Sequence, residues 1–156
     1  MLINDPKKFA IVCSTKNRSA FVRRMILSLD LQAFKGLLLI VDASDQPFAL
    51  EYRTVVADAS DFEVRLFGPG ASRGNNWFET AEGMETLDSE CVLWHHDDDF
   101  YFLDSVERAL QSLLATPEAV CAQGRELFVH AFDRPDKDIY LGLGPSPRAA
   151  NTAPDP

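Results

Sequence analysis

Cysteine is scarce in this chain, and its three residues show no pairing pattern. Cys13, Cys91 and Cys121 form an odd set among 156 residues, and no two of them have Cys-x-x-Cys spacing. Each lies in an apolar segment, so we expect buried free thiols rather than disulfides or zinc ligands. Free thiols are typical of a reducing compartment, which predicts a cytoplasmic location.

Long apolar runs and an excess of positive charge are also missing. No segment approaches the roughly 18 consecutive apolar residues of a membrane span, and the start, MLINDPKKF, has no apolar stretch behind a basic end. Lys and Arg total 15 against 24 Asp and Glu, so the net charge is -9. Such a charge repels nucleic acid and anionic membranes. We therefore expect no nucleic-acid partner, no signal peptide and no transmembrane segment.

Glycine-rich phosphate-binding loops are absent as well. Gly68, Gly70 and Gly74 fit neither the dinucleotide-binding spacing nor the P-loop spacing. A phosphorylated ligand would therefore have to be held by backbone amides, by a few arginines or by a bound cation.

The chain does contain an alternation of strand and helix patterns. Continuous or alternating apolar residues predict strands at residues 9–13, 37–41, 62–67 and 91–94. Apolar residues at helical spacing predict helices at 21–29, 77–84 and 106–114. In the second of these helices, the apolar residues Trp77, Phe78, Ala81 and Met84 are expected to share a face. The order predicts an α/β fold with a mostly parallel sheet, flanked by helices on both faces.

Three consecutive aspartates, Asp97, Asp98 and Asp99, come soon after the strand predicted at 91–94, which we expect to be buried and central. Ligands of open α/β sheets bind at the carboxyl ends of the strands, so the acids should lie at that edge. Adjacent carboxylates repel one another, and a divalent cation is the simplest neutraliser. Acidic runs also occur in solvated loops, so both interpretations stay open. Asp104 and Glu107 have the spacing of a capping box for the next helix.

Polar loops follow the first two predicted strands at the same edge. The first loop holds Thr15, Asn17 and Arg18, and either Asn17 or Ser19 is expected to cap the following helix. The second loop begins at Asp42 and continues through Ala43 and Ser44 to Asp45. One of its two acids is expected to form a turn or cap, and the other would be free to accept hydrogen bonds from a ribose or base.

A loop rich in glycine and asparagine carries Arg73 close to the start of the helix predicted at 77–84. A positive charge at a helix start opposes the macrodipole, so an anionic partner would explain it. A surface arginine without a partner is an equally good explanation.

Further along, strands are predicted at 119–122 and 127–132. We expect one domain at 1–133 and an irregular, disordered tail at 134–156, where proline and aspartate are frequent.

Four segments taken in order resemble the motifs of a known family. They are Ser14-Thr15-Lys16-Asn17-Arg18, Val41-Asp42-Ala43-Ser44-Asp45, Ser72-Arg73-Gly74-Asn75 and Asp97-Asp98-Asp99. They are similar to the first-strand loop, the second-strand acidic segment, the Ala-Arg-Asn helix start and the Asp-x-Asp motif of inverting family 2 glycosyltransferases of the GT-A fold. The departures are Ser14 in place of proline, a single Asp42 in place of an acid pair, and Gly68 where asparagine often precedes Pro-Gly.

The resemblance implies a Rossmann-like GT-A nucleotide-binding domain that takes a nucleoside-diphosphate sugar, most often a UDP-sugar. It would transfer the sugar to an acceptor hydroxyl with inversion. Thr15, Asn17, Arg18 and Asp42 would hold the base and ribose, and Arg73 would approach the nucleotide or diphosphate.

The resemblance also implies roles for the aspartate run. Asp98 and Asp99 would hold Mn²⁺ or Mg²⁺ on the diphosphate. Asp97, with Asp98, would contact the substrate, and Asp97 would lie nearer the sugar or ribose. Hard cations take carboxylate and phosphate oxygens, which agrees with these assignments.

The family's catalytic base has no counterpart here. No Asp/Glu pair follows Gly124, and the single acids there have no motif around them; they are Glu126, Asp133, Asp136 and Asp138. The catalytic residues are therefore unassigned, and the chain would be a truncated enzyme or a noncatalytic nucleotide-sugar-binding module. A metal-dependent hydrolase that uses His96 and the three aspartates is the other alternative. Because neighbouring strand residues point to opposite faces, His95 and His96 cannot easily both join the acids.

Overall fold

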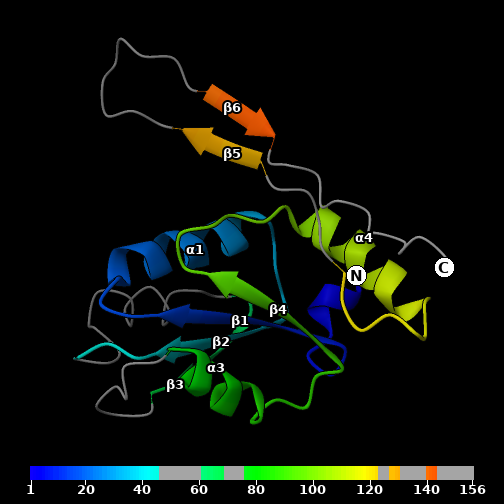
Figure 1. Cartoon of the computed structure of the whole chain (residues 1–156), viewed down its shortest axis with the longest axis horizontal. Helices are drawn as coiled ribbons and strands as arrows, with labels where there is room; N and C mark the ends of the chain where they lie inside the picture. The colour runs from blue at the N-terminus through cyan, green and yellow to red at the C-terminus, as the bar shows by residue number, and fades with distance from the viewer. Residues whose placement is uncertain (46–60, 69–75, 123–126, 131–139, 144–156) are drawn as a thin grey trace, which may run out of the picture.

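The computed structural model describes residues 1–45, 61–68, 76–122, 127–130 and 140–143, and its main element is a parallel sheet (Figure 1). The strands are β1 (Phe9–Thr15), β2 (Leu37–Asp42), β3 (Glu63–Phe67) and β4 (Cys91–His96), in the order β3-β2-β1-β4. All three pairings are parallel, which confirms the predicted α/β class.

The register of the sheet brings the predicted loops together. Thr15 of β1 lies opposite Asp42 of β2, and Ser14 of β1 lies opposite His96 of β4. Parallel strands end at one edge, so the polar segments that follow β1, β2 and β4 emerge side by side.

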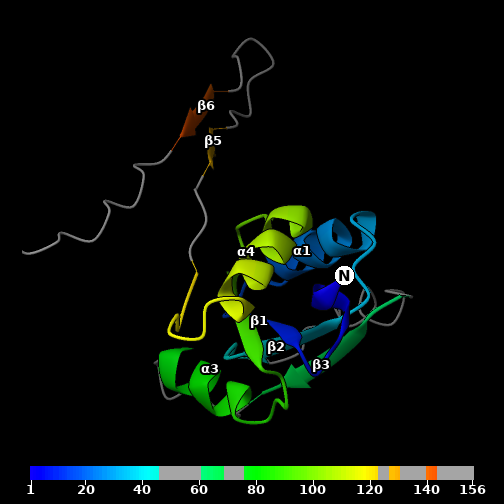
Figure 2. The same ribbon diagram turned by 90° about the vertical axis from the view of Figure 1, so that its right-hand side faces the viewer.

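Helices cover both faces of the sheet, as predicted (Figure 2). Helices α1 (Ser19–Leu31) and α4 (Leu103–Leu114) lie on one face, and α3 (Asn76–Met84) lies on the other. A short 3-10 helix, η1 (Leu2–Asn4), precedes β1.

The larger core lies between the sheet and α1. In α1, the buried residues recur at helical spacing and face the sheet; they are Val22, Met25, Ile26 and Leu29. Strand β2 is buried along its whole length. The sequence predicted this strand correctly because a central strand packed on both faces has no polar alternation.

The smaller core lies under α3, and among the described side chains of the predicted apolar face only Met84 packs against it. Phe78 is 67% exposed, while Thr80 and Gly83 are buried. A Cβ on Gly83 would lie 2.8 Å from Val41 Cγ2, so α3 approaches β2 closely at the glycine.

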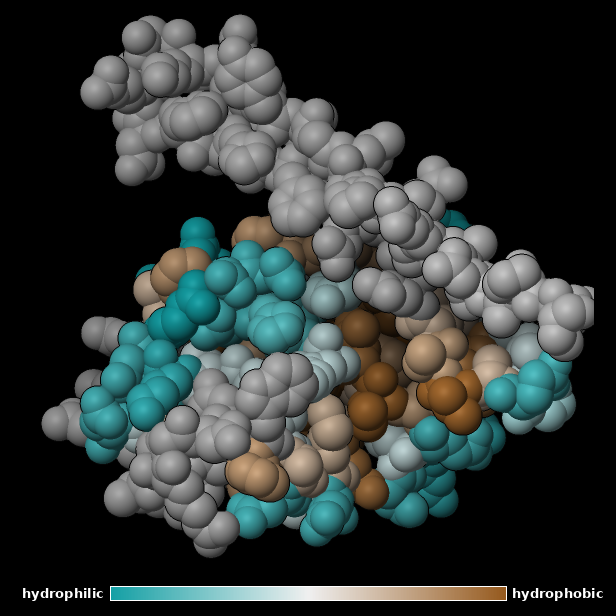
Figure 3. All heavy atoms as spheres, viewed as in Figure 1, coloured by the Kyte–Doolittle hydropathy of each residue, from teal (hydrophilic) through white to brown (hydrophobic). Residues whose placement is uncertain are grey.

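Strand β4 is not the buried central strand that its apolar sequence predicted. Among the described strands it pairs only with β1, and Val92 is 43% exposed. Figure 3 shows apolar residues on the surface over this part of the molecule, beside the more hydrophilic carboxyl-end side. An apolar run therefore formed a partly exposed edge strand.

The predicted helix caps are also wrong, because neither Asn17, Ser19 nor Asp104 occupies an N-cap position. Arg18 occupies the N-cap of α1 and Phe102 that of α4, and neither makes a side-chain cap bond. Asp104 lies in the first turn of α4, while Gln32 Oε1 accepts the Leu103 N–H at 3.0 Å.

The segments after α4 differ from expectation too. Residues 119–122 form no strand, and Val120 is 94% exposed. The strand predicted at 127–132 corresponds to β5 (Leu127–His130), which pairs antiparallel with β6 (Tyr140–Leu143). Strand β6 falls within the segment expected to be irregular, and the other residues of 134–156 lie outside the described part of the chain.

All three thiols are free, as predicted, but only Cys13 is fully buried, and Cys121 is exposed. None of the helices in the described ranges combines the length and apolar character that crossing a membrane requires.

Glu107 of α4 fastens η1 to the domain. Its carboxylate accepts the N–H groups of Leu2 and Ile3, each at 3.0 Å, and the Gln111 amide at 2.9 Å. Burial opposes ionisation, but these three donors outweigh it and lower the pKa of Glu107. The stability that the carboxylate contributes is therefore present above the ordinary pKa of 4.5 and is lost as the pH falls below it.

We expect Glu107→Gln to lower the free energy of unfolding at pH 7 by about 1–3 kcal/mol, because an amide cannot accept both backbone N–H groups. Urea denaturation at pH 7 and pH 3.5 measures this, with the exposed Glu118→Gln as the matched control. The difference between Glu107→Gln and the unaltered chain should shrink at the lower pH. A difference that is the same at both pH values would contradict this role.

Candidate functional site

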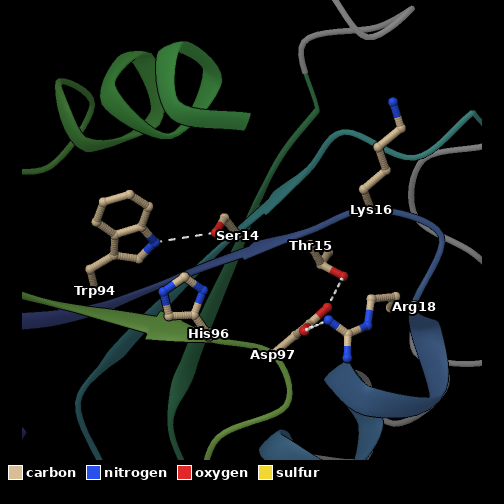
Figure 4. Close-up of a pocket in the computed structure, with 7 residues that line it drawn as sticks. All are labelled: Ser14, Thr15, Lys16, Arg18, Trp94, His96 and Asp97. Atoms are coloured by element: carbon tan, nitrogen blue, oxygen red, sulfur yellow. Dashed lines mark hydrogen bonds and ion pairs between the residues drawn. The ribbon is translucent and has the colours of Figure 1, made fainter. Parts of the chain in front are cut away.

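A pocket of about 220 Å³ opens where β1 and β4 end (Figure 4). Seven residues line it; they are Ser14, Thr15, Lys16, Arg18, Trp94, His96 and Asp97. The pocket thus joins the loop after β1 to the beginning of the aspartate run, as the sequence predicted from the shared sheet edge.

Arg18 and Thr15 hold the first aspartate in place. The Thr15 hydroxyl donates to Asp97 Oδ2 at 2.8 Å, and Arg18 Nη1 lies 3.0 Å from Asp97 Oδ1. Arg18 Nη2 donates to Asp98 Oδ2 at 2.9 Å, so one guanidinium bridges two consecutive carboxylates. The bridge ties the β1–α1 loop to the segment after β4.

The two bridged carboxyls lie in different environments. Asp97 is 5% exposed, and burial raises its pKa despite the opposing effects of Thr15 and Arg18. Asp98 is exposed, and its hydrogen bond from Arg18 lowers its pKa. Asp97 is therefore part of the packed edge, whereas Asp98 is accessible to a ligand.

The loops after β1 and β2 are locked to one another. Asn17 Nδ2 donates to Asp45 Oδ2 at 3.0 Å, and the Asp45 N–H donates to Asn17 Oδ1 at 3.1 Å. The Asn17 N–H donates to Ser44 Oγ at 2.7 Å. Asn17 has φ 55°, a left-handed conformation that asparagine tolerates better than most residues. Its observed contacts thus hold the loop in shape.

Asp42 is fully buried at the end of β2, and its Oδ1 accepts the Ser44 N–H at 3.0 Å. This is the turn-forming role that the sequence predicted for one of the two acids. Asp45, the other, is engaged by Asn17.

The third aspartate of the run lies outside the Arg18 bridge. Asp99 is exposed, and its side chain has no hydrogen-bond or ion-pair partner in the described ranges. Within those ranges, no three His, Cys, Asp or Glu side chains are grouped so that they could hold a metal ion. The donors available to a cation are therefore Asp99 and Asp98, which would be completed by ligand oxygens.

The two histidines point to opposite faces, as predicted. His95 is 1% exposed, its ring contacts Tyr101 at 4.6 Å between centroids, and its Nδ1 donates to the His96 carbonyl. Burial lowers the pKa of His95, which favours the neutral form of the ring. His96 is exposed and lines the pocket beside Asp97.

The aspartate loop is also held from α1. The Gln32 amide donates to the Tyr101 carbonyl at 3.0 Å and accepts the Leu103 N–H at 3.0 Å. No sequence pattern indicated this role for Gln32, because a glutamine near a helix end is usually solvated. Ser14, Lys16 and Trp94 were likewise not assigned to the site. The one sequence feature that could have indicated them is Trp94, which lies two residues before the polar end of its strand.

The site residues predicted from sequence are thus placed at one edge, with one exception. Thr15, Asn17, Arg18 and Asp42 surround the ends of β1 and β2, and the aspartates follow β4. Arg73 lies outside the described residues.

No family model matches this chain, and no curated protein matches it. Several solved structures share its fold. S. aureus TarS 1-349 matches with 17% identity and a TM-score of 0.55, over 69% of this chain and 32% of that chain. The same protein in complex with UDP-GlcNAc gives 17% identity and a TM-score of 0.58, over 69% and 31%. Its complex with UDP gives 16% identity and a TM-score of 0.54, over 69% and 33%.

These matches establish a fold and no more. The chain has a GT-A-like α/β fold, in agreement with the predicted class. It spans 32% of the TarS chain with which it aligns, so the likeness is to a part of that protein.

The Arg18 bridge predicts how the aspartates titrate. In Arg18→Ala, we expect the pKa of Asp98 to rise towards its ordinary value of 3.8 and the pKa of Asp97 to rise further, because Arg18 lowers both. Carboxyl-carbon NMR titration measures both values. Arg24→Ala is the matched control, since Arg24 packs on the same Phe21 ring, 4.3 Å from its centroid, without a bridged carboxylate. Unchanged aspartate pKa values in Arg18→Ala would exclude the bridge.

Proposed function

We propose that this chain binds a nucleoside-diphosphate sugar, a UDP-sugar in particular, and is the donor-binding part of a glycosyltransferase that uses a divalent cation. The observation that carries the proposal is the Arg18 bridge to Asp97 and Asp98 in a pocket at the carboxyl edge of the sheet. The fold shared with TarS, which has been crystallised with UDP and with UDP-GlcNAc, supports it.

The geometry suggests a division of labour between the residues. The interlocked loops of Asn17 and Asp45 give the edge a fixed shape against which a base and ribose can be held. The Arg18 side chain is 39% exposed, so its guanidinium can contact an anionic ligand while it remains close to Asp98. Thr15 and buried Asp97 keep that guanidinium in position.

The exposed carboxylates suit a cation that also binds the ligand. Mg²⁺ and Mn²⁺ in phosphate sites are usually held by one or two carboxylates together with phosphate oxygens and water, rather than by a cage of protein ligands. Asp99 and Asp98 supply such a pair. When bound, the cation would stabilise the negative charge that grows on the departing diphosphate.

Inverting transfer requires a general base near the acceptor hydroxyl. The single acids considered for that role lie in parts of the chain outside the description; they are Glu126, Asp133, Asp136 and Asp138. The proposal therefore assigns donor binding to the described edge, and a noncatalytic nucleotide-sugar-binding module would differ from it only in turnover. The hydrolase alternative gains no support, because the described residues around His96 form no group of three metal ligands.

Titration with UDP, with and without Mn²⁺, tests this function. We expect Mn²⁺ to tighten UDP binding, and Asp99→Asn and Asp98→Asn each to weaken the Mn²⁺-dependent affinity by about 10-fold or more, since even outer-shell changes cost that much. Calorimetry provides the measurement.

Asp104→Asn is the control, because Asp104 is an exposed acid in α4 outside the pocket. Absence of UDP binding, or UDP binding that neither Mn²⁺ nor the two substitutions alter, would overturn the proposal. Zinc binding without any effect on UDP would instead support the hydrolase alternative.

A further inference from the structure

Two aromatic rings on β4 lie beside the ionic part of the pocket. Trp94 and His96 are two residues apart, so their side chains leave the strand on the same side. Their rings are stacked, with centroids 5.6 Å apart and an interplanar angle of 25° (Figure 4). Both rings line the pocket, and His96 is exposed. We call this pair the aromatic platform.

Ser14 fixes the platform and adds a polar group to its border. Trp94 Nε1 donates to Ser14 Oγ at 3.2 Å, which sets the rotation of the indole ring. A serine hydroxyl that accepts a hydrogen bond still has its own proton to donate. Among the described residues, the Ser14 hydroxyl proton has no acceptor. The platform therefore combines two aromatic rings that line the pocket with one hydroxyl donor at their border.

This combination matches the chemistry of a sugar ring. A hexopyranose presents a face of C–H groups, which packs on aromatic rings, and an edge of hydroxyl oxygens, which accept hydrogen bonds. The diphosphate needs neither feature, because charged groups recognise it.

The position of the platform agrees with the sugar end of the ligand. Across the sheet, Asp42 ends β2, Thr15 ends β1 and His96 ends β4. The base and ribose are proposed to lie by the β1 and β2 loops, and the diphosphate by Arg18 and Asp98. Because Arg18 lines the same pocket as Trp94 and His96, the sugar attached to that diphosphate would lie near the platform.

We propose that Trp94 and His96 form the subsite for the donor's sugar ring, with Ser14 donating to one of its oxygens. This inference rests on the proposed function and deepens it, because it separates sugar recognition from nucleotide recognition. Residues that hold only the sugar should affect UDP-sugar binding and leave UDP binding unchanged.

Calorimetry with UDP, UDP-GlcNAc and UDP-glucose in the presence of Mn²⁺ tests the platform. We expect His96→Ala and Trp94→Leu to weaken binding of at least one UDP-sugar by about 3- to 10-fold, the range for loss of one aromatic contact, with UDP affinity unchanged. Trp94→Phe keeps a ring and should retain most of the affinity. Phe78→Ala is the matched control, because Phe78 is an exposed aromatic residue of α3 that does not line the pocket.

The outcomes separate this inference from the function on which it rests. Equal losses for UDP and both UDP-sugars would place the nucleotide on the platform and overturn the inference. Unchanged binding of both UDP-sugars in His96→Ala would overturn it too, and this variant keeps the test valid if Trp94→Leu fails to fold by circular dichroism. If the unaltered chain binds no UDP, the proposed function fails and the sugar subsite fails with it.

Discussion

The ion pair between Arg18 and the two aspartates after β4 is the interaction on which the site depends. A carboxylate as buried as Asp97 would be costly to leave ionised without partners. Its two oxygens are satisfied by different groups, one by the Thr15 hydroxyl and one by Arg18. Removal of either partner would leave a buried charge only partly compensated, so the loop after β1 and the end of β4 are expected to keep their relative position.

Contacts made by Gln32 and His95 also hold the segment that follows β4. Gln32 holds the Tyr101 carbonyl and the Leu103 N–H, and buried His95 packs on Tyr101. The segment after β4 is thus fixed at its start by Arg18 and at its end by α1. Asp98 and Asp99 lie between these two points and are exposed. Such an arrangement presents accessible carboxylates from a backbone that is held at both ends, which favours binding of a ligand without a large ordering cost.

Much of the fold could be predicted from local patterns, while features set by neighbouring elements could not. The β2 strand and the α1 face follow from apolar spacing, and the shared edge of Thr15 and Asp42 follows from parallel pairing. Among the described strands, β4 lies at the edge of the sheet. This position could not be predicted, because an apolar run predicts burial whether or not the strand has a second neighbouring strand. The cap predicted for α4 failed for a related reason: Gln32, from the end of α1, accepts the Leu103 N–H, and Glu107 binds the N–H groups of η1. For the site, the aspartates and the first two loops were found from sequence, but the Trp94–Ser14 contact needs the β1–β4 register.

The charge balance at the edge explains why a cation belongs in the proposed function. Asp97 and Asp98 share one bridging guanidinium, and Lys16 is the only other Lys or Arg among the described residues that line the pocket. A diphosphate brings further negative charge to a site that is already acidic, in a chain whose net charge is -9. Arg18 carries a single positive charge and already contacts two carboxylates. In the proposed function, a divalent cation shared by the exposed carboxylates and the phosphates would turn this repulsion into attraction, so that metal and nucleotide would bind together.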